Sequence, residues 1–205
     1  MNKFIFATFS LILTLVLGCA DLTAKRYPNS DDQSVEGGQH SELGAGSTQQ
    51  NQITEEEETA IKTFTSGGKS TGQFSDINTA LRTNDIASIQ YHKATIEALL
   101  SALNKLPKFQ GTVYRCTDLP EEELKKYAVK ARITYRSFTS TSKSKVISEN
   151  FGANCFEIQS LTGRDIESLA TDRAEREVLF APNAEFEVKD ILNDEIKMIE
   201  VTSPY

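Results

Sequence analysis

Three short segments of this chain carry side chains that could do chemistry together. Val113–Arg115 places an arginine at the end of an expected strand, Phe138–Ser142 is a strand leading into a turn of serines and threonines, and Glu175–Leu179 brings paired carboxylates into a strand. An arginine at a strand end can bind a phosphate through two hydrogen bonds. A carboxylate held in place stabilises a cation that develops during a reaction.

Glu175 and Glu177 are separated by one residue. In an extended chain, residues i and i+2 point to the same face, so both carboxylates could face the same reacting carbon. Each segment alone has an ordinary explanation: a surface arginine, a turn or helix cap, and the solvated face of a strand. The order and spacing of all three together favour a catalytic site.

Three helices are expected ahead of these segments. Thr54, followed three residues later by Glu57, has the pattern of a capping box and predicts a helix start. Apolar residues at helical spacing predict how far each helix extends. The expected helices run from Thr54 to about Phe64, with Ser66-Gly67-Gly68 as the stop, from Phe74 to Arg82, and from Ile86 to Leu106, where Pro107 ends the third.

Short β-favouring segments dominate the second half of the chain. Helices first and strands later, without βαβ alternation, predict an α+β domain with a largely antiparallel or mixed sheet. The expected strands are Gly111–Cys116, Ile133–Thr139, Cys155–Ser160, Glu177–Ala181, Glu185–Val188 and Ile196–Val201, with a small helix at Leu119–Ala128 and a helical turn at Lys145–Asn150.

Together with the helices, the three segments resemble the arginine-serine-glutamate class of mono-ADP-ribosyltransferases. That class includes enzymatic components of actin-modifying binary toxins, other single-chain bacterial toxins and vertebrate arginine-specific ecto-transferases. The resemblance covers roughly residues 53–201. Beyond the three segments it includes Phe64–Gly67, then Phe74, Ile77, Asn78, Leu81 and Arg82 as the helical entry to the NAD site, Phe151 in a later loop, and Pro182–Val188 as a hairpin.

The resemblance implies the ADP-ribosyltransferase-like fold, in which N-terminal helices pack on two mostly antiparallel or mixed sheets with an NAD cleft between them. It implies NAD as co-substrate without a metal, and transfer of ADP-ribose to an arginine of a target protein. Actin or another host protein is the kind of target it suggests. Nicotinamide would be released, and hydrolysis of NAD would be a side reaction.

The resemblance also assigns roles to four residues. Arg115 would hold the pyrophosphate or the nicotinamide ribose, and Ser140 would orient Glu177. Loss of nicotinamide leaves an oxocarbenium-like ribose, as in glycoside hydrolysis, which Glu177 would stabilise. Glu175 would accept hydrogen bonds from the acceptor guanidinium, which is fully protonated and a poor nucleophile.

Three further residues are expected to contact NAD. Asn78 matches an asparagine at the phosphates or the adenine side, although an exposed polar helix residue is the alternative. Cys116 stands where the family often has a glycine whose backbone meets the nicotinamide amide. Phe151 would stack on the nicotinamide ring or pack in the core, and the two interpretations have equal weight. Phe74 stands where a tyrosine is usual, which removes a hydroxyl near NAD.

Two other functions compete with transfer. An NAD glycohydrolase would use the same site with water as acceptor, and the intact pair of Glu175 and Glu177 argues against it. A non-enzymatic surface lipoprotein could use a degenerate transferase fold for binding. The complete set of Arg115, Ser140 and Glu177 argues against degeneration.

Length, composition and charge limit the other classes of function that the protein could have. The chain has 205 residues and a formal net charge of -7, which suits one domain with appendages and argues against a nucleic-acid-binding groove. We expect a monomer. The apolar run from Phe4 to Leu17 after Lys3 is short for a membrane span and predicts a signal peptide over residues 1–19. Gly18-Cys19 resembles a lipobox; a plain signal peptide is the equal alternative.

Residues 20–52 are polar and predict a flexible leader, which places the catalytic domain at residues 53–205. The protein is therefore expected to be secreted or lipid-anchored at the cell envelope. Two cysteines, Cys116 and Cys155, remain after export, and an oxidising compartment permits a disulfide between them. Two small buried side chains are the alternative. We expect the two residues to lie close together.

Overall fold

The computed structural model describes residues 52–66 and 73–202. All of the described residues belong to one compact unit. The expected signal peptide, with Cys19, and the leader up to residue 51 lie outside the described residues. None of the helices in the described ranges has the length and hydrophobicity of a transmembrane span.

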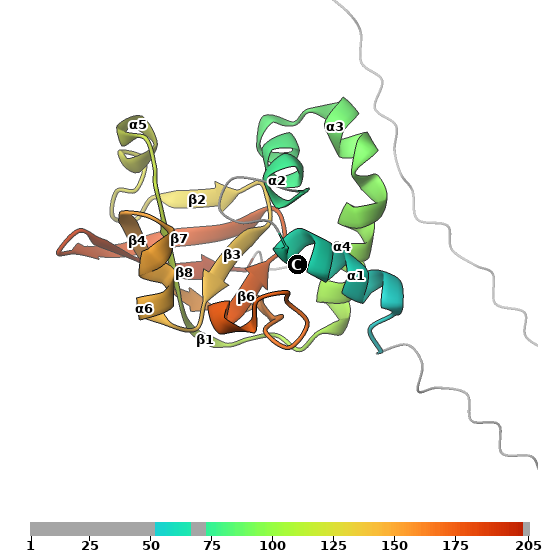
Figure 1. Cartoon of the computed structure of the whole chain (residues 1–205). Helices are drawn as coiled ribbons and strands as arrows, with labels where there is room; N and C mark the ends of the chain where they lie inside the picture. The colour runs from blue at the N-terminus through green and yellow to red at the C-terminus, as the bar shows by residue number, and fades with distance from the viewer. Residues whose placement is uncertain (1–51, 67–72, 203–205) are drawn as a thin grey trace, which may run out of the picture. The chain divides into compact units, whose positions relative to one another are not determined.

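The first two helices are those that the sequence predicts. Helix α1 (Glu55–Thr65) begins with a capping box, in which the Thr54 N–H donates to Glu57 and the Glu57 N–H donates to the Thr54 hydroxyl. Helix α2 spans Gln73–Thr83. Helices α1 and α2 lie on the same side of the strands (Figure 1) and share a core that includes Ile61, Phe64 and Ile77.

The single helix expected from Ile86 to Leu106 is wrong. The structure has two helices, α3 (Ile86–Tyr91) and α4 (Lys93–Lys105), which are interrupted at His92. The ψ angle of His92 is 7°, far from the helical value near −42°. Its N–H still donates to the Ser88 carbonyl at 3.0 Å, so hydrogen bonding continues where the regular geometry does not.

The strands form one mixed sheet of eight, in the order β2-β7-β8-β4-β1-β3-β6-β5. Only the pair β4 and β8 is parallel among these strands. The strands are β1 Gly111–Thr117, β2 Arg132–Tyr135, β3 Thr139–Ser142, β4 Asn154–Ser160, β5 Arg164–Asp165, β6 Glu177–Phe180, β7 Ala184–Leu192 and β8 Glu195–Val201. Short helices are α5 Glu121–Leu124, α6 Lys145–Ser148, η1 Glu149–Phe151 and η2 Arg173–Glu175.

The expectation of two separate sheets is therefore wrong, because β1 pairs on both of its edges. It pairs with β4 along its whole length, but with β3 only through Tyr114 and Ser142. Two hydrophobic cores accompany the sheet. One joins the N-terminal helices to Phe138 and Leu179, and the other gathers residues of several strands, such as Phe156 of β4 and Phe180 of β6.

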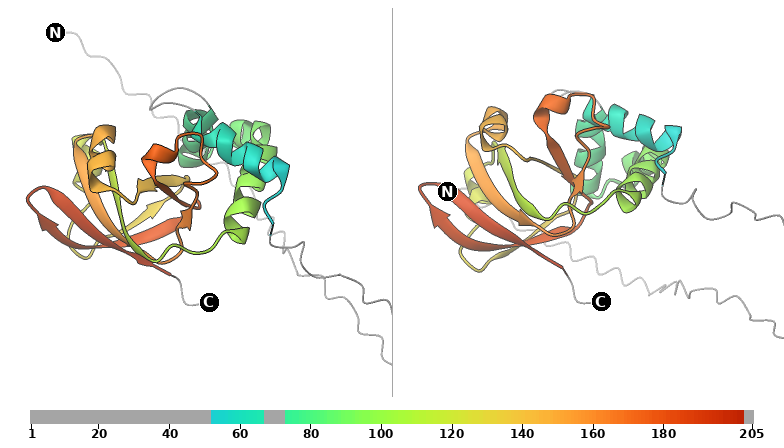
Figure 2. Two further views of the ribbon diagram at one scale, coloured as in Figure 1. Left: turned by 60° about the horizontal axis from the view of Figure 1, so that its bottom comes forward. Right: turned by 90° about the horizontal axis from the view of Figure 1, so that it is seen from below.

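The strand expected over Ile133–Thr139 is also wrong as a single element. Strand β2 ends at Tyr135 and lies at the sheet edge beside β7, whereas β3 begins at Thr139 and lies between β1 and β6. The intervening residues carry the chain from one part of the sheet to the other. The loop before β6 lies next to α1 (Figure 2), where the Thr171 N–H donates to the Thr65 hydroxyl at 3.0 Å.

Candidate active site

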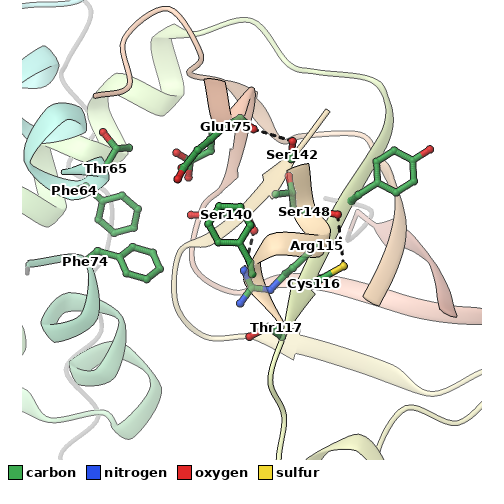
Figure 3. Close-up of a pocket in the computed structure, with 14 residues that line it drawn as sticks. Phe64, Thr65, Phe74, Arg115, Cys116, Thr117, Ser140, Ser142, Ser148 and Glu175 are labelled. Carbon is green, nitrogen blue, oxygen red and sulfur yellow. Dashed lines mark hydrogen bonds between the residues drawn. The ribbon is translucent and has the colours of Figure 1, made fainter. Parts of the chain in front are cut away.

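A cavity of about 380 Å³ lies between the helices and the strands that carry the three chemical segments. Phe64 and Phe74 stand on the helical side, and Arg115 and Ser140 approach from the strands opposite (Figure 3). The two phenylalanine rings pack edge to face with centroids 5.0 Å apart. The lining residues are Phe64, Thr65, Phe74, Tyr114, Arg115, Cys116, Thr117, Ser140, Thr141, Ser142, Ser148, Phe151, Glu175 and Glu177.

Arg115 projects from β1 toward β3. Its Nη1 donates a hydrogen bond of 2.8 Å to the main-chain carbonyl of Ser140. This contact holds the plane of the guanidinium while using one of its five N–H donors. The remaining N–H donors of the guanidinium can bind a phosphate or another anion in the cavity.

Ser140 and Glu177 come from paired strands, since β3 and β6 run antiparallel. The Ser140 hydroxyl hydrogen-bonds the Glu177 side chain. Glu177 is buried, with 5% of its surface exposed. Burial, and then the charge of Glu175, raise its pKa from 4.5 to about 7, against the lowering effects of the Ser140 hydrogen bond and of Arg115. Such a buried carboxylate is ready to interact with a cation formed beside it.

Glu175 reaches the cavity by a different route from the predicted one. It is not in an extended strand: it ends the 3-10 helix η2, and Arg176 after it is left-handed, with φ 50° and ψ 48°. The i, i+2 argument for a shared face is therefore wrong, yet both carboxylates line the same cavity. Burial and the neighbouring charge of Asp172 raise the pKa of Glu175.

The turn residues after Ser140 hold the backbone of the third segment. The Thr141 hydroxyl donates to the Val178 carbonyl at 2.6 Å, and the Ser142 hydroxyl donates to the Glu175 carbonyl at 2.8 Å. Strand β3 therefore fixes the chain on both sides of Glu177. From the sequence alone, these two hydroxyls are expected only to complete a turn.

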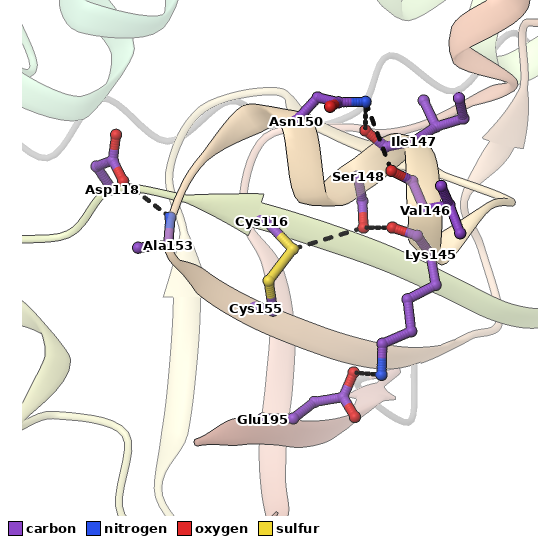
Figure 4. Close-up of a disulfide and its surroundings, with 10 residues drawn as sticks. All are labelled: Cys116, Asp118, Lys145, Val146, Ile147, Ser148, Asn150, Ala153, Cys155 and Glu195. Atoms are coloured by element: carbon purple, nitrogen blue, oxygen red, sulfur yellow. Dashed lines mark hydrogen bonds and ion pairs between the residues drawn. A yellow bond between two sulfur atoms is a disulfide. The ribbon is translucent and has the colours of Figure 1, made fainter. Parts of the chain in front are cut away.

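Cys116 and Cys155 are bonded to each other, which confirms the expected proximity (Figure 4). They face each other across β1 and β4, with their Cα atoms 4.1 Å apart. Cys116, the residue that follows Arg115 in the sequence, also lines the cavity. Its Sγ lies 3.5 Å from the hydroxyl of Ser148, another lining residue. The disulfide is thus part of the cavity wall.

The structure separates the two remaining predicted NAD contacts. Phe151, at the end of η1, lines the cavity. Asn78 does not line it, and its contact with NAD stays a prediction. The alternative of an exposed Asn78 is wrong, because the residue is only 1% exposed. Its buried Oδ1 has no hydrogen-bond partner within the described part of the chain.

Arg82, which the resemblance places in the helical entry to the NAD site, lies one turn after Asn78 on α2. It does not line the cavity, and its Nη2 donates to the Thr79 hydroxyl at 3.1 Å. Burial, and then the positive charge of Arg115, lower the pKa of Arg82. Its contact with NAD stays a prediction.

Comparisons with known proteins agree with this arrangement. Residues 36–203 match the family described as NAD:arginine ADP-ribosyltransferase. The chain is 33% identical over 179 residues to Mav of Mycobacterium avium (strain 104), which is named as a candidate NAD(+)–arginine ADP-ribosyltransferase. The matched region covers 83% of this chain and 21% of Mav. It is 32% identical over 155 residues to Vis of Vibrio splendidus (strain 12B01), over 68% of this chain and 60% of Vis.

Solved structures show the same fold. The crystal structure of ADP-ribosyltransferase Vis in complex with agmatine has a TM-score of 0.61 and 30% identity, and covers 74% of this chain and 76% of Vis. ADP-ribosyltransferase HopU1 of Pseudomonas syringae pv. Tomato DC3000 has a TM-score of 0.61 at 22% identity, over 71% and 76% of the two chains, and shows the fold alone. By fold and by sequence, the chain belongs to the NAD:arginine ADP-ribosyltransferase family.

Proposed function

We propose that this protein transfers ADP-ribose from NAD to an arginine side chain of a target protein. The observation that carries the proposal is the meeting of Arg115, Glu175 and the Ser140-bonded Glu177 around one cavity. Family membership supports it. The complex of the related Vis with agmatine, a guanidinium compound, supports a guanidinium as acceptor.

In this proposal, Arg115 and Arg82 bind the pyrophosphate and Glu177 acts on the ribose. The bond from C1′ to the nicotinamide nitrogen breaks, and nicotinamide leaves with the bonding electrons. The ribose becomes oxocarbenium-like, and the nearby carboxylate of Glu177 stabilises it in its deprotonated form. Ser140 keeps that carboxylate oriented.

Glu175 acts on the acceptor. Its carboxylate accepts hydrogen bonds from the guanidinium and directs one nitrogen at C1′ of the ribose. A new C1′–N bond forms, and the proton that the guanidinium loses passes to Glu175 or to solvent. The raised pKa of Glu175, caused by burial and by Asp172, favours its acting as that proton acceptor.

The wider biology belongs to the same proposal. We infer an exported toxin-like protein, secreted or anchored at the envelope through residues 1–19, that modifies a host protein. The chain spans 21% of Mav and 60% of Vis, so targets and delivery are not transferred from those relatives.

A labelling experiment tests the activity. The protein is incubated with NAD labelled in its adenine, with and without agmatine, and products are separated. We expect ADP-ribosyl-agmatine and free nicotinamide with agmatine, and slower release of ADP-ribose without it. Nicotinamide release that never yields an agmatine adduct would indicate a glycohydrolase, and no turnover would indicate a binding protein.

A further inference from the structure

Lys143 is a partly buried cation at the base of the loop that carries Glu175. It directly follows β3, and its side chain is 16% exposed. Its Nζ lies 2.5 Å from Asp165 Oδ2 and 2.5 Å from Glu167 Oε2. Asp165 is the last residue of β5 and Glu167 lies at the start of the loop between β5 and β6, so one ammonium group neutralises two neighbouring negative charges there.

The main chain of Lys143 holds the other end of the same loop. Its N–H donates to the Arg176 carbonyl at 3.0 Å, directly after Glu175. A single residue therefore connects the first residues of the loop to the last. The side-chain part of this connection is electrostatic: burial alone would lower the pKa of Lys143, but Asp165 and Glu167 raise it, so the ammonium stays charged.

Glu177 has contacts that this connection does not supply. It lies within β6, which pairs with β3, and its side chain receives the Ser140 hydrogen bond. Its link to the start of the loop is a main-chain bond, in which the Ile166 N–H donates to the Glu177 carbonyl at 3.1 Å. Glu175 lies outside any strand, in a 3-10 turn followed by a left-handed residue. A change in the loop would therefore move Glu175 more than Glu177.

We propose that Lys143 is a positioning residue for the transfer step, holding the loop so that Glu175 stays directed into the cavity. Loss of its charge leaves Asp165 and Glu167 repelling each other and loosens the loop. The proposal rests on the division of roles between Glu175 and Glu177 proposed above. It implies that Lys143 affects transfer to a guanidinium and spares hydrolysis of NAD.

The test compares Lys143→Met with a matched control, Lys126→Met, which removes an exposed ion pair with Glu123 on α5. Steady-state rates are measured with NAD alone and with NAD plus agmatine. We expect Lys143→Met to lower kcat/KM for transfer about tenfold while hydrolysis and the KM for NAD change by less than about twofold. Lys143→Arg should recover most of the transfer, and Lys126→Met should match the wild type.

A double-mutant cycle then asks whether Lys143 acts through Glu175. Residual transfer is followed with enzyme in excess over labelled NAD, in the wild type and in Glu175→Gln. If the proposal holds, Lys143→Met has no further effect once Glu175 is replaced. Equal losses in both backgrounds, equal losses of transfer and hydrolysis, or no loss of transfer would each overturn it.

Two further measurements keep these outcomes distinguishable. If circular dichroism shows that Lys143→Met is unfolded, Glu167→Gln is measured instead. This variant leaves the contact of Lys143 with Asp165 intact. If Glu167→Gln does not lower transfer selectively, the proposal fails. Glu175→Gln alone is measured first. If that variant keeps full transfer, the proposed role of Glu175 is wrong, a failure separate from any result on Lys143.

Discussion

Glu175 and Glu177 face one cavity from two different kinds of backbone: Glu175 ends a 3-10 helix, and Glu177 begins strand β6. The left-handed Arg176 between them replaces the simple alternation of a strand. Each carboxylate is held by a different set of contacts, so their contributions can be separated by mutation.

The first prediction concerns these two carboxylates. Glu177→Gln keeps the size and removes the charge, so transfer and NAD hydrolysis should both fall by two to three orders of magnitude, about 3–4 kcal/mol. Glu175→Gln should reduce transfer to agmatine to a small residual rate and leave much of the hydrolysis, because water needs no guanidinium contact. Steady-state kinetics with NAD alone and with NAD plus agmatine measures both. Hydrolysis that survives in Glu177→Gln but not in Glu175→Gln would reverse the assignment.

The second prediction concerns pH. Burial raises the pKa of Glu177 from 4.5 to about 7, so the folded state binds this proton more tightly than the unfolded state. The contribution of Glu177 to stability is therefore most favourable below about pH 4.5 and is lost as pH rises to about 7, a change of about 3 kcal/mol. Urea denaturation at pH 5 and pH 8 measures it.

Glu177→Gln is the control for the pH prediction. Glutamine does not titrate, so the variant should be more stable than the wild type at pH 8 and show a smaller loss between the two pH values. In the wild type, kcat/KM for NAD hydrolysis should rise with pH through about 7 as Glu177 deprotonates. A pH-independent difference between the two proteins would contradict the assignment.

The third prediction concerns the disulfide. Cys116 and Cys155 are 39 residues apart in sequence, and a bond that closes a loop of this length stabilises a protein by about 4 kcal/mol in the chain-entropy treatment. Replacing both cysteines by serine should lower the melting temperature by a corresponding amount, and dithiothreitol should do the same to the wild type. Dithiothreitol should leave the double variant unchanged; a further decrease there would point to another cause.

The fourth prediction concerns the two arginines. Arg115→Ala and Arg82→Ala should each raise the KM for NAD about five- to thirtyfold, which is about 1–2 kcal/mol, because each removes a cation from the expected pyrophosphate site. Arg82→Ala should leave kcat near the wild-type value. Arg132, exposed on β2, offers the control Arg132→Ala. An unchanged KM in Arg82→Ala would remove Arg82 from the NAD site.

Local chemistry alone was enough for the elements whose signals lie within a few residues. The capping box of Thr54 and Glu57 set the start of α1, and the β-favouring segment from Gly111 gave β1. Arg115, Ser140, Glu175 and Glu177 could be selected because their order along the chain matches a known class of enzymes. The structure brings these four residues together around one cavity.

Other features depend on contacts between distant parts of the chain. No local pattern shows that β1 would pair on both edges and join the strands into one sheet. The left-handed turn at Arg176 is stabilised by hydrogen bonds from Ser142 and Lys143, more than thirty residues earlier. The burial of Asn78 and the ion pairs of Lys143 likewise follow from packing. Such contacts are decided only in the folded chain, since their energy depends on which distant segments meet.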